Sequence, residues 1–512
     1  MKLVNADVIN ANGQESKKVR VLLVYLSIYN YFSLALGYIA AYLMNKDIKN
    51  RVELRIKNLP INVKKFTKYT GISRSNFLYG SEKNFNNHFL AFVNNYRPDV
   101  IGFSCYIWNY KKTIEFCNKI KKINPNMLII LGGPCVSSLQ YSKEVLKKNP
   151  SVDVVVRYDG EVTFYEIIKN LVDSNRNFSN ILGITYRNKN KIVANPARPL
   201  LENLDEIPSP YTSGIYEKYI LSENSKHLTF FDPTNFLIET SRGCPFNCSY
   251  CFDKNRSSGK VRFFSLERVR EELNYLSTRV KTINSIYFTD SIINIKKQRL
   301  IELCEMLIQK KFRYSHIDFE IRPEILDSEM IENIRKIGNL SAECGIQTTN
   351  KKAGTIIHRS FDEHTCTRNI KAMQEKKIRV VSNLIVGLPG DDLAGFKKSL
   401  YYIFKLNPDL CLCFTLMILP GTEIYEMRKK YHCRFDENNS NIIISNDTWS
   451  EKDLNDAFKL VYLFEKFQYK KNILNFILRY SYLRLVIART IYNPKAVARS
   501  FINKVEQLIG MI

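Results

Sequence analysis

Three absences narrow the class of this 512-residue protein. Met1–Gln14 lacks the basic and then apolar pattern of a secretory signal peptide, so we expect a protein of the reducing cytoplasm. Nine of the 12 cysteines are scattered without regular spacing, which argues against a disulfide scaffold. An unbroken apolar span is also missing. Val21–Leu43 is uncharged and long enough to cross a bilayer, but polar Ser27–Asn30 divides it into a strand, a loop and a helix, so we expect no transmembrane span.

Acidic residues are scarce relative to basic ones. The chain has 50 Asp and Glu against 76 Lys and Arg, which gives a formal net charge of +26. A protein with such a charge could bind an anionic partner such as nucleic acid or a membrane surface. The many Asn–Lys pairs in loop-like segments favour the plainer interpretation, a composition rich in lysine and asparagine. The apolar content of 45% is ordinary for a globular protein with a large core.

One cysteine triplet carries the strongest chemical signal. Cys244, Cys248 and Cys251 lie in Ser-Arg-Gly-Cys-Pro-Phe-Asn-Cys-Ser-Tyr-Cys-Phe (241–252), and the nearest histidine is His227. Thiolates suit iron–sulfur clusters and zinc. A cube of four irons held by three cysteines leaves one iron open, whereas a structural zinc site is closed by four ligands. The spacing favours the cluster over two alternatives, a zinc site completed from a distance and three buried cysteines without a metal.

This loop resembles the signature of radical S-adenosylmethionine (SAM) enzymes, including the aromatic Tyr250 before the third cysteine. The resemblance implies a [4Fe–4S] cluster held by the three cysteines, whose open iron chelates the amino and carboxylate groups of SAM. An electron from the reduced cluster would then cleave SAM to methionine and a 5′-deoxyadenosyl radical, which takes a hydrogen atom from the substrate. The resemblance further implies that Tyr250 and the backbone of Phe252 border the adenine.

The residues between 235 and 432 show six strand-like runs, each followed by a helical stretch. They are Phe236–Thr240, Ser285–Thr289, His316–Ile321, Ser341–Gln347, Arg379–Val386 and Cys411–Leu419. This pattern predicts a partial (β/α)6 barrel whose active face lies at the carboxyl ends of its strands. Cys244 directly follows the first run. Polar residues at the other strand ends, and a glycine where the family lines the adenine pocket, are candidate SAM contacts: Asp290, Arg322, Glu343, Gln347, Asn383 and Gly387. Arg322 could instead pair with a carboxylate of the core.

Residues 19–194 alternate strands and helices, which predicts a doubly wound parallel sheet. The expected strands are Val19–Tyr25, Asp99–Cys105, Met127–Leu131 and Val152–Val156. Ligands of such sheets bind at the carboxyl ends of the strands, which points to the loops 27–33, 104–109, 132–137 and 158–161. Residues 46–90 read as an irregular elaboration with one weak strand near Val52–Ile56.

The same loops resemble the cobalamin-binding domain that precedes many radical SAM cores. The resemblance rests on residues 33–43, Gly-Phe-Ser-Cys-Tyr-Ile-Trp-Asn (102–109), Leu-Gly-Gly-Pro (131–134) and Asp-Gly-Glu-Val-Thr-Phe (159–164). Glycines suit a flat macrocycle that needs close backbone approach. The Asp-x-His-x-x-Gly motif of other cobalamin domains is absent, so cobalamin would bind without a histidine ligand. The implied contacts are Ser33, Leu34, Ser104, Tyr106, Gly132, Gly133, Pro134 and Glu161.

The remaining segments complete an α/β organisation. Residues 195–234 contain five prolines and read as a linker, while helical stretches are expected at Glu451–Phe476, Leu483–Ile491 and Lys495–Gln507. We expect the helical extension to close the barrel; a basic, aromatic face for a peptide, nucleic acid or membrane is the alternative. The predicted domains are an N-terminal tail (1–18), a cobalamin-binding-like domain (19–194), the linker (195–234), a radical SAM core (235–432) and a C-terminal extension (433–512).

We therefore predict a radical SAM enzyme that uses a [4Fe–4S] cluster, SAM and cobalamin to methylate an unactivated carbon of a small molecule or peptide. Flavodoxin or ferredoxin is the expected electron donor. The first alternative is a radical enzyme of the same architecture that catalyses cyclisation, ring rearrangement or oxidation. A weaker one is an RNA methylthiolating enzyme, which would need a second cysteine cluster. The last is a non-catalytic cobalamin- or nucleic-acid-binding protein with a structural metal.

Overall fold

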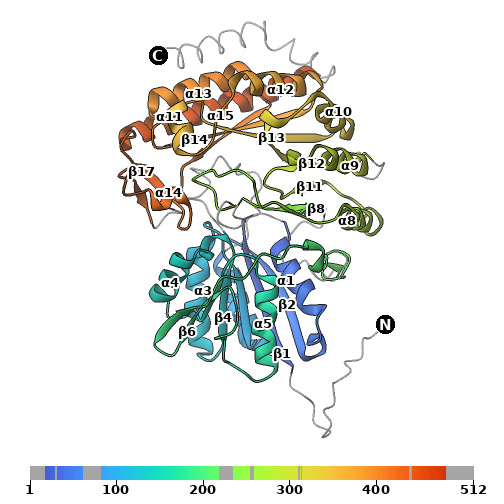
Figure 1. Ribbon diagram of the computed structural model, residues 1–512, viewed down its shortest axis with the longest axis vertical. Coiled ribbons are helices and arrows are strands. Elements are labelled where there is room, and N and C mark those ends of the chain that lie inside the picture. Colours follow the sequence, from blue (N-terminus) through green and yellow to red (C-terminus); the bar gives the residue numbers. More distant parts are fainter. Residues whose placement is uncertain are drawn as a thin grey trace.

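The structure is a computed structural model that describes residues 18–28, 31–61, 82–217, 234–253, 259–308, 312, 314–437 and 441–479. Two α/β units follow one another along the chain (Figure 1). The first contains a seven-stranded sheet and the second a six-stranded sheet. The predicted helices Leu483–Ile491 and Lys495–Gln507 lie outside the described residues.

The N-terminal sheet has the order β2-β1-β3-β4-β5-β6-β7. Strands β1 to β5 pair in parallel, and β6 and β7 add an antiparallel hairpin at one edge. Because β2 and β3 lie on opposite sides of β1, the chain reverses direction there, and the crevice of the sheet opens beside β1 and β3. The strands are β1 (Val19–Ser27), β2 (Val52–Pro60), β3 (Val100–Ser104), β4 (Leu128–Gly132), β5 (Val154–Val156), β6 (Ile184–Asn188) and β7 (Lys191–Ala194).

Helices cover both faces of this sheet, which explains why β1 is almost wholly apolar. Val21 and Leu23 pack in the same core cluster as helices α1 and α5, whereas Leu22 and Val24 pack in the cluster that contains residues of α2, α3 and α4. The helices are α1 (Leu34–Met44), α2 (Glu82–Tyr96), α3 (Tyr110–Ile123), α4 (Leu139–Lys148) and α5 (Glu161–Val172).

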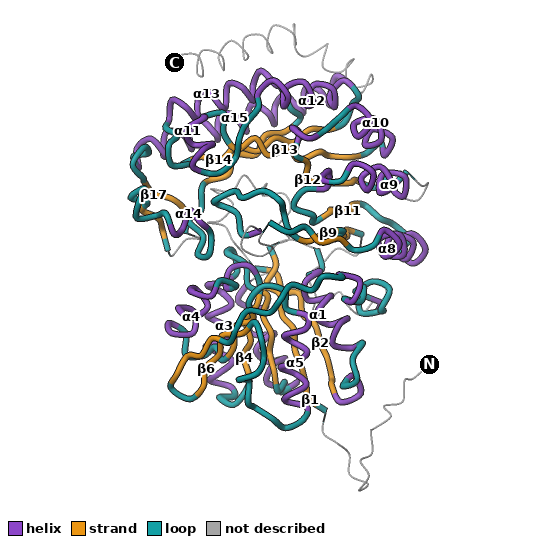
Figure 2. Tube along the Cα trace, viewed as in Figure 1, coloured by secondary structure: helices purple, strands orange, loops and turns teal. Residues whose placement is uncertain are grey.

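The second sheet has the order β15-β14-β13-β12-β11-β8, and every neighbouring pair is parallel. Figure 2 shows the strands curving, with helices outside them. The strands are β8 (Asn235–Ile238), β11 (Ser285–Phe288), β12 (His316–Ile321), β13 (Leu340–Gln347), β14 (Arg379–Val386) and β15 (Leu410–Thr415). The helices are α8 (Leu266–Arg279), α9 (Lys297–Leu307), α10 (Ser328–Ile337), α11 (Lys351–Ile356), α12 (Glu363–Glu375) and α13 (Leu393–Leu406). This confirms the predicted fold class, a doubly wound sheet followed by a partial (β/α)6 barrel.

Strand β12 illustrates how the barrel is built. Its buried residues, Ile317, Phe319 and Ile321, belong to the apolar core, whereas the alternating residues His316, Asp318 and Glu320 are partly exposed. Successive side chains of a strand point to opposite faces. One face of the sheet therefore packs in the apolar core, and the other carries polar groups.

The C-terminal segment covers the far edge of the barrel. It forms α14 (Glu423–Glu426), a hairpin of β16 (Arg434–Asp436) and β17 (Ile442–Ser445), and the long helix α15 (Glu451–Arg479). The side chain of Gln468 in α15 accepts a hydrogen bond from the backbone N–H of Cys411 at 3.0 Å. The helix thus satisfies a donor of edge strand β15 that would otherwise be exposed. This agrees with a helical extension that closes the barrel.

The carboxyl ends of the two sheets face each other. Asp159, which follows β5, makes an ion pair with Arg242, which follows β8. Ser138, beyond β4, packs against Gly421, beyond β15. Loops that leave the two sheets at their ligand-binding edges therefore meet at one interface (Figure 1).

The structure differs from the sequence expectation in the segment 46–90. Strand β2 runs from Val52 to Pro60 and pairs with β1 along nine residues, so it is an integral strand and not a weak one. Helix α2 was not predicted. Among the described residues, no helix has the length and apolar character needed to cross a membrane, and Val21–Leu43 contains strand β1 and helix α1.

Candidate functional site

The cysteine loop leaves the barrel immediately after β8. Gly243 has a φ of +98°, a backbone conformation that favours glycine, and it turns the chain into Cys244. Two backbone hydrogen bonds hold the middle of the loop: the Ser249 N–H donates to the Ile357 carbonyl at 3.1 Å, and the Ile424 N–H donates to the Ser249 carbonyl at 2.8 Å. The loop is therefore held by segments that follow β13 and β15.

The three thiols lie near one another. Cys248 is buried and the other two are partly exposed. Burial, together with the nearby charges of Asp253, Cys248 and Cys244, raises the pKa of Cys251 to about 12. A bound cation such as iron would supply the positive charge that favours the thiolate form of such a ligand. Within the described ranges, no three His, Cys, Asp or Glu side chains gather closely enough to hold a single metal ion.

Arg322 reaches the loop from the end of β12. Its guanidinium lies 3.7 Å from the centre of the Phe246 ring, within the cysteine loop, and its Nε is 3.4 Å from Glu324 Oε2. Its Nη1 is buried and has no hydrogen-bond partner among the residues that the structure describes. An unpartnered buried donor is costly, and a carboxylate would satisfy it. The guanidinium thus fits an anionic ligand group beside the cysteines.

A second set of polar side chains lies across the barrel strands. Asn383 donates to Glu343 Oε1 at 2.6 Å, and Tyr287 donates to Glu320 Oε1 at 2.7 Å. Glu320 and Glu343 are register partners on β12 and β13. Burial and the nearby Glu343 raise the pKa of Glu320 to about 8, so it is protonated at neutral pH. Tyr287 was missed by sequence reasoning, although its place beside the strand-end carboxylates follows from the parallel register.

Several predicted SAM contacts are already engaged by the chain itself. Asp290 is 1% exposed and accepts hydrogen bonds from the backbone and hydroxyl of Thr240 and from the hydroxyl of Ser241. Burial raises its pKa to about 6. Gly387 has a φ of +89°, and a Cβ there would lie 2.7 Å from Ile443 in the C-terminal hairpin. The close approach at Gly387 is therefore to the extension.

Gln347 ends β13 at a register irregularity, with a φ of +69°. The backbone carbonyl of Gly345 accepts a hydrogen bond from Arg359, a buried residue that sequence reasoning did not identify. Tyr250 and Cys248 both interact electrostatically with Arg359. The end of β13 is thus tied to the cysteine loop. Phe252 lies near Gly421, where a Cβ would come within 3.9 Å of its ring.

The predicted cobalamin contacts lie at the carboxyl ends of the N-terminal strands. Ser33 caps helix α1, and its carbonyl accepts a hydrogen bond from the Tyr216 hydroxyl at 2.9 Å. Leu34 and Ser104 are buried, and Tyr106 stacks on Trp108 with ring centres 4.5 Å apart.

The glycine pair after β4 has two distinct environments. Gly133 has a φ of +101°, and a Cβ there would lie 2.6 Å from the Cys105 carbonyl oxygen. At Gly132 the nearest atom would be 3.9 Å away, in Val156, so its surface is open. Pro134 begins a short 3-10 helix after the pair. An open glycine surface fits a flat group that approaches the backbone.

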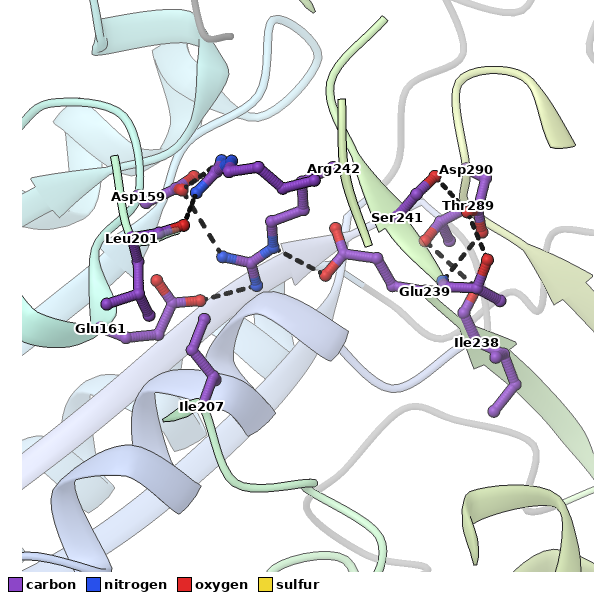
Figure 3. A network of polar contacts seen from close by, with 12 residues as sticks. Asp159, Glu161, Leu201, Ile207, Ile238, Glu239, Ser241, Arg242, Thr289 and Asp290 are labelled. Atoms are coloured by element: carbon purple, nitrogen blue, oxygen red, sulfur yellow. Dashed lines mark hydrogen bonds and ion pairs between the residues drawn. The ribbon is translucent and has the colours of Figure 1, made fainter. Parts of the chain in front are cut away.

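Glu161 points away from these loops and toward the barrel. Its Oε1 accepts a hydrogen bond from Arg242 Nη2 at 2.8 Å, and its side chain is 7% exposed (Figure 3). The carboxylate expected to contact cobalamin thus forms an ion pair between the domains. His88, the one histidine of residues 19–194, is exposed on α2.

These features define a class of protein: a doubly wound domain and a partial barrel whose strand-end loops meet at one interface, with three free cysteines in a loop beside it. The comparisons agree. Residues 238–402 match the radical SAM superfamily and residues 27–168 match the B12 binding domain. The chain belongs to the radical SAM superfamily, with a B12-binding domain at its N-terminal side.

Among curated proteins, the uncharacterized methyltransferase PH0819 of Pyrococcus horikoshii is 26% identical over 335 residues, which are 65% of this chain and 70% of that protein. The cobalamin-dependent radical SAM methyltransferase TokK of Streptomyces tokunonensis is 28% identical over 346 residues, 64% of this chain and 48% of TokK. The match thus spans about half of TokK. The solved cobalamin-dependent radical enzyme OxsB with aqua-cobalamin and SAM has a TM-score of 0.65 at 16% identity, over 97% of this chain and 72% of OxsB.

The protein is therefore a radical SAM enzyme, and its cofactors are a [4Fe–4S] cluster, SAM and cobalamin. The residues present fit these groups. Three thiols from one loop can hold the cluster, the free donor of Arg322 can take a carboxylate, and the open surface at Gly132 can receive cobalamin.

Proposed function

We propose that this enzyme transfers a methyl group from SAM to an unactivated carbon. When bound, the cluster would supply the electron that cleaves SAM, and cobalamin would supply the methyl group. One observation carries the proposal: the loops at the carboxyl ends of the two sheets contact each other at one interface. The ion pairs of Arg242 with Asp159 and Glu161 lie at this interface. The names of PH0819 and TokK, both methyltransferases, support the transfer of a methyl group.

The residue roles follow from the contacts. Cys244, Cys248 and Cys251 would ligate the cluster, and Arg322 would orient SAM through its carboxylate. Tyr250, Phe252, Gln347 and Gly387 would border the SAM pocket. Glu343, held by Asn383 at 2.6 Å, would accept a hydrogen bond from SAM or the substrate. Asp290 would keep the strand-end segment of Thr240 and Ser241 in place.

On the cobalamin side, the open backbone at Gly132, with Gly133 and Pro134 behind it, would receive the macrocycle or its nucleotide tail. Ser33, Leu34, Ser104 and Tyr106 would line the crevice beside β1 and β3. Glu161 would act through Arg242.

We also propose a small-molecule or peptide substrate, a flavodoxin or ferredoxin as electron donor, and a reducing cytoplasm as the location. All 12 cysteines are free, which supports the last proposal. The basic, aromatic face suggested for the C-terminal region falls mostly outside the described side chains.

The test uses anaerobically reconstituted enzyme, a chemical reductant and SAM with a deuterated methyl group. The substrate pool is a small-molecule extract of the native cells, and mass spectrometry follows 5′-deoxyadenosine and new products. The proposal predicts a product that carries the deuterated methyl group. Deoxyadenosine released alongside a product without the label would instead support cyclisation, ring rearrangement or oxidation.

A further inference from the structure

A buried network of charges joins the two domains next to the cysteine loop (Figure 3). At its centre is Arg242, whose side chain is 3% exposed. Its Nη2 donates to Glu161 at 2.8 Å, its Nε donates to Glu239 at 2.9 Å, and its Nη1 lies 3.8 Å from Asp159. The first and third contacts cross from the barrel to the B12-binding domain.

A second guanidinium reinforces the first. Strands β9 (Ser241–Arg242) and β10 (Arg262–Phe263) form a two-residue antiparallel ladder that pairs Arg242 with Arg262. Paired residues of such a ladder lie side by side on one face. Arg262 is 1% exposed, donates to Asp159 at 2.9 Å and also binds the Leu201 carbonyl at 2.8 Å. Both arginines thus form ion pairs with Asp159, in the turn between β5 and α5.

Aromatic rings from both domains fix the plane of the Arg242 guanidinium. It lies 5.1 Å from the ring centre of Tyr38 in α1 and 5.9 Å from that of Phe264 in the barrel. The two rings are stacked, with centres 5.8 Å apart. A guanidinium held by rings and carboxylates has a fixed position and a fixed orientation.

The position of Arg242 links this network to the cluster. Only Gly243 separates it from Cys244, and on its other side Asp290 fixes Thr240 and Ser241. A buried ion pair contributes little net stability compared with apolar packing, but it is directional. The network is therefore suited to set a geometry between the domains.

We propose that Arg242 is a positioning residue that fixes the spacing between the cluster loop and the cobalamin loops through Asp159 and Glu161. The proposal rests on the proposed function only in that both cofactors are bound. The positioning role goes beyond the proposed function, because the protein would set this spacing even if no methyl group were transferred. A shift of about 1 Å in such a site can cost on the order of 100-fold in rate.

The test measures the spacing directly. In the holoenzyme with reduced cluster and cob(II)alamin, the fast-relaxing cluster speeds the electron-spin relaxation of cob(II)alamin, with a steep dependence on the distance between them. Relaxation of cob(II)alamin is recorded for the wild type, Arg242→Lys, Glu161→Gln and the double variant. The control is Lys121→Gln, which removes an ion pair of 2.8 Å with Asp153 inside the B12-binding domain.

We expect the cluster-induced relaxation to change in both single variants, with iron and cobalt contents kept. The relaxation in the double variant should change no more than in the more affected single variant, because both substitutions disturb the same contact, that of Arg242 with Glu161. Methyl transfer per deoxyadenosine released should fall on the order of 100-fold. Lys121→Gln should behave as the wild type.

Wild-type relaxation in the two single variants would overturn the proposal, as would loss of the cluster alone, since that would assign Arg242 to cluster retention. If Arg242→Lys does not fold, Glu161→Gln, which keeps the shape of the side chain, decides the question. If the wild type shows the coupling but transfers no methyl group, the proposed function fails and the positioning role stands.

Discussion

Arg322 offers the sharpest test of how SAM is held. Its guanidinium is buried beside the cysteine loop with one donor atom unused by the described chain. A hydrogen bond between charged groups contributes about 1.5–3 kcal/mol, so Arg322→Gln should weaken SAM binding by about 12- to 160-fold. Arg322→Lys should lose part of this affinity, because an ammonium cannot reproduce the planar fork.

The assay is equilibrium binding of SAM to the anaerobically reconstituted enzyme, with iron content measured for each variant. Glu324→Gln is the matched control, because it removes the carboxylate 3.4 Å from Arg322 and leaves the guanidinium in place. It should keep SAM affinity within about threefold of the wild type. Unchanged binding in Arg322→Gln, or an equal loss in Glu324→Gln, would refute the reasoning.

Three further predictions concern the barrel and its neighbours. The pKa of Glu320 is about 8 in the folded protein against 4.5 for the free group, so the unfolded chain loses this proton first. The free energy of unfolding should therefore fall as pH rises from about 4.5 to 8. Glu320→Gln should reduce the fall in Tm between pH 5.5 and 8, and an identical fall in this variant would contradict the raised pKa of Glu320. Gly133→Ala should cost about 1–3 kcal/mol and abolish cobalamin binding, because its φ is +101° and the new Cβ meets Cys105. Gly132→Ala is the control for stability, and an equal loss of stability in this variant would contradict the strain assigned to Gly133. Gly387→Ala should speed proteolysis of the C-terminal hairpin more than Gly338→Ala, since both have a φ of +89° and only Gly387 has a neighbour, Ile443, at 2.7 Å. Equal proteolysis of the two variants would contradict this explanation, because backbone strain at the positive φ would then account for the effect without the contact with Ile443.

The regular elements could be predicted from the sequence where periodicity was strong. The bounds of His316–Ile321 and Arg379–Val386 agree with the structure, because alternating or continuous apolar residues mark these strands. Helix α2 was missed because five of the 15 residues of Glu82–Tyr96 are asparagine, a weak helix former, although seven others are apolar. Tertiary packing on α3 stabilises what local sequence only weakly favours.

The site was predictable only in part. The three cysteines and the strand-end positions follow from local spacing and from the parallel register. The pairing of Glu161 with Arg242 joins residues 81 positions apart, and no local pattern reveals it. The same holds for Gly387, whose neighbour Ile443 belongs to a hairpin that folds back over the barrel.

The measurement that tests the account most directly is 5′-deoxyadenosine release from SAM by the anaerobically reconstituted and reduced enzyme. The wild type should release it. Cys251→Ala should not, because the cluster would lose one of its three ligands. Cys304→Ala, which alters a buried cysteine of helix α9 outside the loop, should release it as the wild type does. No release by a wild type that contains iron, or equal release by Cys251→Ala, would contradict the assignment of this loop as the radical-generating site.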